Sequence, residues 1–184
     1  MGSSVRWVTA ASLSLCASAC SLRGLSEEFD GTETPAVEDP SLVREAEAGQ
    51  RSGAFFVVED SEARGGAYVR TRPGTTCSSE DPNNKVRFEF EVDVTGDYQI
   101  RTGAIAPDEL SDSFLVRVDD APDEGYLYML PNKTGVIFSD LVHHETGQEM
   151  KQLVVVPLKE GVHAVEFFCR EPGAGLDWIA LERR

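Results

Sequence analysis

The clearest pattern in the chain is a strict alternation of apolar and polar residues over positions 86–94. The apolar set on one face of an extended strand is Val86, Phe88, Phe90, Val92 and Val94, and the four residues between them are all charged. A period of two is typical of an antiparallel strand with one buried and one solvated face. A turn at Thr95-Gly96-Asp97 and a second alternation from Tyr98 to Thr102 predict that the two strands form a hairpin.

Further short strands are predicted along the rest of the chain. They cover residues 114–118, 126–130, 135–138, 153–158, 162–169 and 176–181, with turn residues between them. Helical periodicity is weak: residues 42–49 fit a short helix and a first strand equally well, and nothing longer keeps a period of 3.6. Many short strands separated by turns predict an all-β domain, either a β-sandwich or a barrel.

The N-terminal residues are typical of an export signal. Arg6 precedes an acid-free run over residues 7–19 that suits a signal-peptide core and is too short to span a bilayer. The run ends in Ala17-Ser18-Ala19-Cys20, which resembles the lipobox of bacterial lipoproteins. The resemblance implies that residues 1–19 are removed and that Cys20 carries the lipid. Ser21 after it implies an outer-membrane location in the cell envelope. A plain signal peptide, cut before an incidental Cys20, is the alternative.

Residues 20–42 are expected to form an extended, solvated linker, because glycines, prolines and acids interrupt every period. Residues 43–184 remain for one folded domain. The 184-residue chain has a net charge of −15, with 41% hydrophobic and 27% charged residues, which is a globular composition. So acidic a surface repels phosphate backbones and argues against a nucleic-acid partner. We expect a monomer.

The four cysteines divide by segment. Cys16 lies in the signal peptide and Cys20 at the lipidation position, which leaves Cys77 and Cys169 in the domain. In an exported protein an even pair predicts a disulfide. Two buried free thiols are the alternative, since sequence spacing does not show proximity.

Six short phrases within residues 43–184 follow one another in a fixed order: residues 45–47, 65–69, 96–101, 111–119, 158–163 and 170–179. Their order resembles that of the family 6 and family 35 carbohydrate-binding modules. The resemblance implies a jelly-roll β-sandwich of two antiparallel sheets, polysaccharide binding without catalysis, and a structural calcium ion. Carried over by position, it implies Glu45, Glu47 and Asp177 as calcium ligands. On an extended strand Glu45 and Glu47 point to one face, and a hard cation needs several such oxygens.

The same resemblance implies a sugar site with Tyr68 as the stacking ring and Asp112 and Glu171 in nearby loops. Tyr126 and Tyr128, two residues apart on one face, are candidates for a second platform. The chain departs from the family pattern where an asparagine is usual before the last strand, since Gly173-Ala174-Gly175 stands there. Alternation places Trp178 opposite Asp177, with Leu176 and Ala180, and predicts that it is a core residue.

Catalytic and transition-metal motifs are not evident. The adjacent His143 and His144 point apart in an extended chain and are expected to be exposed loop residues. The sequence has no Gly-x-Ser-x-Gly, His-Glu-x-x-His or phosphate-binding glycine loop. We therefore expect a lipid-anchored, extracytoplasmic carbohydrate-binding domain that is not an enzyme. The alternative is a structural or adhesive envelope protein that has lost sugar binding.

Overall fold

The computed structural model describes residues 39–77, 81, 83–131, 135–147 and 151–184. The expected signal peptide, Cys20 and all but the end of the 20–42 linker lie outside these residues. The described part contains strands and three short 3-10 turns, η1 (Pro40–Leu42), η2 (Ala46–Ala48) and η3 (Arg64–Gly66). None of its helices is long and apolar enough to cross a membrane.

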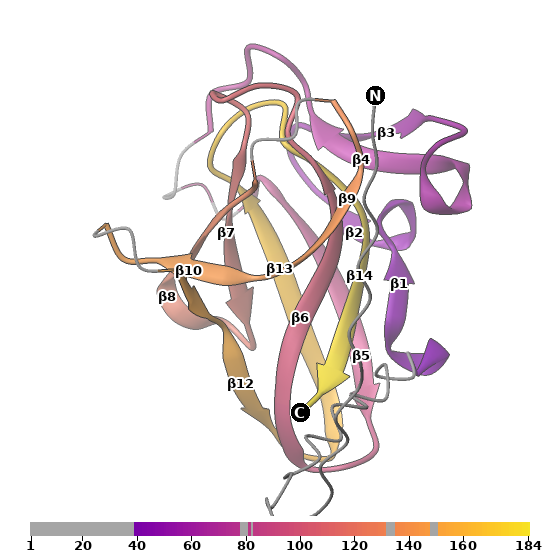
Figure 1. The fold of residues 1–184 in the computed structure, drawn as a ribbon, viewed down its shortest axis with the longest axis vertical. Helices are drawn as coiled ribbons and strands as arrows, with labels where there is room; N and C mark the ends of the chain where they lie inside the picture. The colour runs from indigo at the N-terminus through magenta and orange to yellow at the C-terminus, as the bar shows by residue number, and fades with distance from the viewer. Residues whose placement is uncertain (1–38, 78–80, 82, 132–134, 148–150) are drawn as a thin grey trace, which may run out of the picture. The chain divides into compact units, whose positions relative to one another are not determined.

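The strands form two main antiparallel sheets packed face to face (Figure 1). Sheet A has the order β12-β6-β14-β4-β3, with β1 on β14 and β9 on β6, and sheet B has the order β2-β5-β13-β7-β8. Strands β10 and β11 form a separate ribbon. The strands of sheet A are β1 (Val43–Glu45), β3 (Phe55–Glu59), β4 (Ala67–Thr71), β6 (Gly96–Ile105), β9 (Phe138–Leu141), β12 (Val155–Leu158) and β14 (Gly175–Arg183). The others are β2 (Gln50–Arg51), β5 (Lys85–Val92), β7 (Ser113–Val118), β8 (Ala121–Met129), β10 (His143–Glu145), β11 (Lys151–Leu153) and β13 (Gly161–Cys169). The predicted jelly-roll β-sandwich is confirmed.

The core fills the space between the sheets. The alternation that predicted β5 is confirmed, because its even-numbered apolar residues from Val86 to Val92 are all buried. Phe167 of β13 packs edge-to-face against Phe88 and Phe114, with ring centroids 6.3 and 5.7 Å apart. Leu42 of η1 is also buried in this core. The folded part therefore includes η1, which precedes the expected boundary at residue 43.

The predicted hairpin between the first two strands is wrong. Strand β5 belongs to sheet B and pairs with β13 and β2, whereas β6 belongs to sheet A and pairs with β14, β12 and β9. The turn at Thr95 and Gly96 carries the chain from one sheet to the other. Both strands still bury an apolar face, because the two faces point at the same core from opposite sides.

The predicted core position of Trp178 is also wrong. A β-bulge lies between Leu176 and Trp178 where β14 pairs with β6. The extra residue reverses the alternation, so that Ile179 and Leu181 join the core cluster while Trp178 lies half-buried on the outer face. There Arg64 lies above its ring, 5.4 Å from Cζ to the centroid.

The predicted disulfide is confirmed. Cys77 and Cys169 are bonded, with their Cα atoms 5.3 Å apart and a sequence separation of 92. The bond ties the segment after β4 to the end of β13, and so links sheet A to sheet B. Cys169 is buried, and Cys77 packs against the core.

Candidate functional site

The start of the β13–β14 connection meets the start of β7 in a small polar cluster. Glu171 Oε2 accepts hydrogen bonds from Ser113 Oγ, at 2.7 Å, and from the backbone N–H of Asp112, at 3.3 Å. Arg170 Nη1 lies 2.8 Å from Glu171 Oε1 and donates to Ser113 Oγ at 2.7 Å. These bonds hold the half-buried side chains of Arg170 and Glu171 against the buried hydroxyl of Ser113. We call Asp112, Ser113, Arg170 and Glu171 the loop cluster.

The two acids of the loop cluster differ in their protonation. Burial, followed by the hydrogen bond to Glu171 and repulsion from its charge, raises the pKa of Asp112 to about 6. Burial also acts to raise the pKa of Glu171, but hydrogen bonds from Ser113 and Asp112 and the charge of Arg170 lower it on balance. Asp112 Oδ1 is buried and has no hydrogen-bond partner among the described residues. The cluster thus combines an unused acceptor with a fixed cation.

A hollow of about 480 Å³ adjoins the loop cluster on the outer side of sheet B. Its apolar lining comes from Leu115, Gly125 and Leu127, and Arg170 is the residue that it shares with the loop cluster. The rest of its polar lining is Glu124, His144 and Glu145. An apolar floor with a few polar groups around it is the usual composition of a small-ligand site.

The expected second platform is not available for stacking. Tyr126 and Tyr128 do share a face of β8, but that face is the core side of sheet B. Tyr128 is fully buried, and its hydroxyl lies 2.9 Å from Thr102 Oγ1. A buried ring cannot stack on a sugar, so the prediction for Tyr128 is wrong. Tyr126 is half-buried and packs edge-to-face against His144.

The histidines predicted to lie in an exposed loop are both half-buried in β10 instead. His144 Nδ1 accepts the backbone N–H of Leu127 at 3.0 Å, so this side chain joins β10 to the edge of β8. That bond and the contact with Tyr126 fix one wall of the hollow.

Tyr68 also lacks an open ring face. It is 7% exposed and packs on the outer face of sheet A with Ala63 and Ile105, so the expectation of a stacking platform here is wrong. The cause is Gly175 beneath it, where an added Cβ would lie 3.2 Å from the ring. Gly173, in the place of the usual asparagine, has a φ of 104° and would bring a Cβ 3.0 Å from Ser111 Oγ. A side chain at that position would strain the backbone and crowd Ser111.

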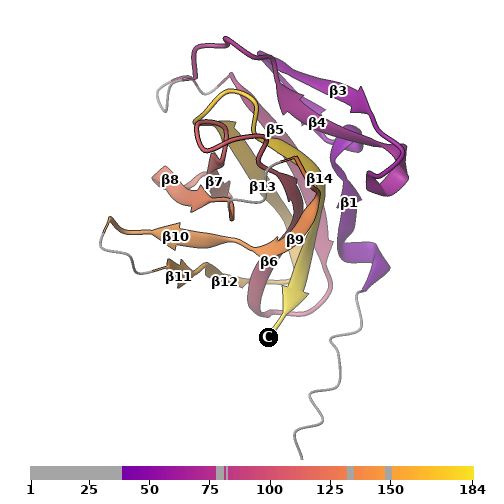
Figure 2. The same ribbon diagram turned by 45° about the horizontal axis from the view of Figure 1, so that its top comes forward.

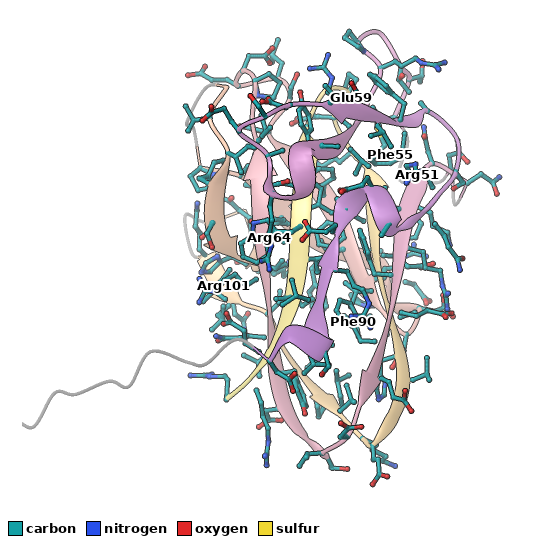
Figure 3. The ribbon with its side chains drawn as sticks, turned by 90° about the vertical axis from the view of Figure 1, so that its right-hand side faces the viewer. Arg51, Phe55, Glu59, Arg64, Phe90 and Arg101 are labelled. Carbon is teal, nitrogen blue, oxygen red and sulfur yellow. A yellow bond between two sulfur atoms is a disulfide. The ribbon has the colours of Figure 1, made fainter. Side chains whose placement is uncertain are left out.

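Three carboxylates gather around Gly65 and around Arg64, which is labelled in Figure 3. They are Glu45, Glu47 and Asp177. The Arg64 side chain contacts Glu45 Oε1 at 3.1 Å, and its backbone N–H donates to Asp177 Oδ2 at 3.1 Å. Gly65 is close enough that an added Cβ would lie 2.8 Å from Glu47 Oε1 and 3.5 Å from Glu45 Oε2. We call these three acids the acidic cluster.

The acidic cluster departs from the expected geometry in one respect. Glu45 ends β1 but Glu47 lies in η2, so the two do not alternate along one strand. One oxygen of each acid, Glu45 Oε2, Glu47 Oε2 and Asp177 Oδ1, is buried without a hydrogen-bond partner among the described residues. Burial and repulsion from Glu45 and Glu47 raise the pKa of Asp177 to about 6, and burial likewise raises the pKa of Glu45. In the described part of the chain, no group of three or more His, Cys, Asp or Glu side chains is already arranged to hold a metal ion.

Ser113 and the pairing of Arg64 with Trp178 were not predicted from the sequence. Ser113 shows no signal of its own, because a serine at the start of a strand is also typical of a turn. Arg170 immediately precedes Glu171, and a basic residue beside a candidate acid was the available signal for it.

Comparison with solved structures identifies the architecture. A family 35 carbohydrate-binding module from Clostridium thermocellum superimposes with a TM-score of 0.56 at 20% identity, covering 76% of this chain and 97% of the module. The C-terminal family 6 module of LamC, a marine laminarinase from Zobellia galactanivorans, gives a TM-score of 0.52 at 16% identity, covering 77% and 98%. The chain has the fold of these carbohydrate-binding modules.

A third similar structure places the same fold within a larger chain. It is a GH26-CBM35 β-(1,4)-mannanase from Podospora anserina, with a TM-score of 0.58 at 15% identity over 78% of this chain. The match covers only 27% of the mannanase. No family model and no curated protein matches the sequence.

Proposed function

We propose that this domain binds polysaccharide, without catalysing a reaction, at the loop cluster and the adjoining hollow. The observation that carries the proposal is the meeting of Arg170, Glu171 and the unpartnered Asp112 oxygen beside an apolar floor, in a fold shared with carbohydrate-binding modules. Sugar hydroxyls take hydrogen bonds from a guanidinium and give them to carboxylates, while the C–H faces of the ring pack on apolar side chains. With no open aromatic ring in the cluster, binding is polar and weak.

Two arguments support binding over hydrolysis. Asp112 and Glu171 are in direct contact, with the Asp112 backbone N 3.3 Å from Glu171 Oε2. A retaining glycosidase instead holds its two carboxyl groups about 5–5.5 Å apart, and an inverting one farther, so that a sugar bond lies between them. Two solved structures match over nearly their entire length, 97% and 98%, and both are carbohydrate-binding modules and not catalytic domains.

We also propose a structural calcium ion at the acidic cluster. Calcium is a hard cation that prefers carboxylate and carbonyl oxygens, and the donor set of Glu45, Glu47 and Asp177 is of that kind. Each of the three acids has a buried oxygen without a partner among the described residues, and a bound cation would satisfy these oxygens. When bound, the ion supplies charge neutralisation that fastens β1 and η2 to β14. Lipidation at Cys20, which would tether the domain to the outer membrane through the 20–42 linker, completes the proposal.

A glycan array that includes uronic-acid polymers tests the binding proposal. The protein used is the chain from residue 20 with the substitution C20S. We expect a selective signal that R170M and E171Q reduce at least about tenfold, the effect of losing one charge-assisted hydrogen bond. The matched controls R183M and E160Q change exposed residues elsewhere. An array without preference, or equal binding by R170M and R183M, contradicts the proposal.

Two further assays separate the alternatives. Release of reducing ends from any polysaccharide would indicate an enzyme. The structural or adhesive envelope role is favoured by two observations, the buried ring of Tyr68 and the closed position at Gly173. A glycan array that shows no preference for any glycan would support this structural or adhesive role. Incorporation of labelled palmitate into the wild-type chain but not into C20S tests the anchor.

A further inference from the structure

Strand β3 is an open edge of sheet A (Figure 2). It pairs with β4 over residues Phe55↔Thr71 to Glu59↔Ala67, and in the ladder no strand of the described residues pairs with its other side. The sequence of β3 is Phe-Phe-Val-Val-Glu, which is rich in residues that favour strands. It contains no proline or lysine, two residues that commonly protect an edge from pairing.

The direction of the backbone groups of β3 follows from its register. The Asp60 N–H donates to the Gly66 carbonyl at 3.0 Å and so continues the β3–β4 register by one residue. In an antiparallel ladder alternate residues direct both backbone groups to the same side. Phe56 and Val58 therefore bond to β4, and Phe55, Val57 and Glu59 direct their N–H and C=O groups to the open side.

From this edge we infer that a second copy of the chain pairs with β3, antiparallel and about a twofold axis at Val57. In this register Val57 faces Val57 of the second copy, and Phe55 faces Glu59 in both directions. All the outward N–H and C=O groups of the three residues are then bonded. A twofold axis makes the surface complementary to itself, which is the usual symmetry of protein dimers.

The side chains fit the same register. Val57, one of the exposed large apolar residues at 38% exposure, meets its own copy on the axis. On the outer face Phe56 meets Val58 of the second copy, extending the apolar patch formed by Val58, Tyr68 and Ile105. Pairs of aromatic and β-branched residues across strands stabilise a sheet.

Charge complementarity selects a second copy as the occupant. Arg72 lies at one end of β3, with its Cζ 5.6 Å from the centroid of the Phe56 ring, and the acids Glu59, Asp60 and Glu62 follow the other end. If the register is extended by one residue beyond Phe55, Ala54 lies opposite Asp60 of the second copy. Arg72 follows Thr71 of β4 and lies level with Ala54 on its other side. Antiparallel pairing thus brings the end of β3 near Arg72 close to the acidic end of β3 in the second copy. The twofold axis repeats this contact, so that the dimer contains it twice.

Pairing through β3 would place two candidate sugar sites on one particle. Two linked weak sites can bind a long polymer far more tightly than one, by a factor of about 10²–10⁴ when both engage. This consequence rests on the proposed function, whereas the pairing itself does not, so an array without preference would leave the dimer in place.

Sedimentation of the chain from residue 20 with C20S tests the pairing at concentrations up to about 1 mM, where even weak specific complexes are populated. We expect a reversible dimer. V57K places two like charges across the axis and should weaken association at least about tenfold. V162K, at an exposed valine of β13, is the matched control and should leave association unchanged. A monomer throughout this range, or equal effects of V57K and V162K, overturns the inference.

Two further variants identify the partner as a second copy in this register. R72E and D60K should each be monomeric alone, because each homodimer would contain two like-charge contacts. Mixed together they should form a heterodimer, in which both contacts have opposite charges. V57C should also form a disulfide-linked dimer on oxidation, since directly opposed residues lie within disulfide range, whereas V162C should not. Failure of the mixture to associate while the wild-type chain dimerises overturns this register.

Discussion

Asp112 and Glu171 are in direct contact, because the Asp112 N–H donates to Glu171 Oε2 at 3.3 Å. Only one of two carboxyl groups in such contact ionises readily. Glu171 keeps the charge, because Ser113 and Arg170 stabilise it, and Asp112 keeps the proton until about pH 6. The loop cluster therefore presents a donor and an anion side by side in mildly acidic conditions.

D112N tests this shared proton through stability. The folded-state pKa of Asp112, about 6, is above its ordinary value of 3.8, so wild-type stability falls as the pH rises from about 4 to 6 and changes no further through this group. The amide that replaces the carboxyl group in D112N does not titrate. The difference in free energy of unfolding between D112N and wild type should therefore shift in favour of D112N by on the order of 1 kcal/mol from pH 4 to pH 7, after allowance for solvent screening.

Urea unfolding at the two pH values measures this gain, with the exposed D123N as the control substitution. A D112N difference that is equal at both pH values would contradict the shared proton.

Calcium should stabilise the domain and change the environment of Trp178. Arg64 contacts Glu45 and also lies over the Trp178 ring, so a cation that takes up Glu45 displaces or reorients Arg64. Trp178 is the only tryptophan after residue 7. A calcium titration should shift its fluorescence and raise the melting temperature, and D177N should remove both effects. E59Q, an acid outside the acidic cluster, is the control. A melting temperature that is the same in calcium and in chelator contradicts the calcium site.

Periodicity predicted many of the strands but not which sheet each one joins. The apolar face of β5 was predicted because Val86 to Val92 alternate without a break, and β7, β8, β12, β13 and β14 were predicted from the same signal. Strands β3, β4, β10 and β11 are short and were not predicted. The predicted hairpin between β5 and β6 was wrong. Two alternating strands joined by a turn have the same sequence pattern whether the chain reverses within one sheet or crosses to the facing sheet. The predicted position of Trp178 was wrong because a β-bulge reverses the alternation of side chains, and the amino-acid sequence does not show where a bulge occurs.

Removing the disulfide should destabilise the domain without changing its fold. The Cys77–Cys169 bond closes a loop with a sequence separation of 92, and long loops lose the most chain entropy when closed. The double variant C77A/C169A should lose about 2–4 kcal/mol in the free energy of unfolding. Urea unfolding measures the loss, and the variant should retain the circular dichroism of an all-β protein. Reductant should lower the stability of wild type and leave that of the variant unchanged. An unchanged midpoint in the variant would contradict this role.

The site was predicted in part, because a sequence shows where acids occur but not which residues surround them. Asp112 and Glu171 were predicted to approach one end of the domain, and the structure brings them into contact across a sequence separation of 59. The aromatic platforms failed for a physical reason. Tyr68 lies over a glycine and Tyr128 points into the core, and a sequence does not show which residues cover a ring.

His163 should titrate above its ordinary pKa of 6.5. Burial acts against its charged form, but the side chain of Asp119, 2.6 Å from Nδ1, and the carbonyl of Lys159 raise the pKa of His163 on balance. A raised histidine pKa stabilises the fold below about pH 6.5, and that contribution is lost as the pH rises through the folded-state pKa. NMR titration of the imidazole measures the shift. D119N keeps a hydrogen-bond acceptor but removes the charge, and it should therefore lower the pKa of His163. An unchanged His163 pKa in D119N would show that Asp119 is not the cause.

Gly103 is the position where a single methyl group should disturb both β14 and the acidic cluster. A Cβ on Gly103 would lie 2.2 Å from Trp178 Nε1, so G103A forces the indole ring away from β6. Overpacking of this kind costs about 1–3 kcal/mol, and the displaced ring takes away the surface on which Arg64 lies. G96A is the matched control in the same strand, because its added methyl meets only the flexible end of Arg183, at 2.9 Å. Urea unfolding and Trp178 fluorescence should therefore change in G103A and stay close to wild type in G96A. Equal effects of the two variants would mean that the indole is free to move.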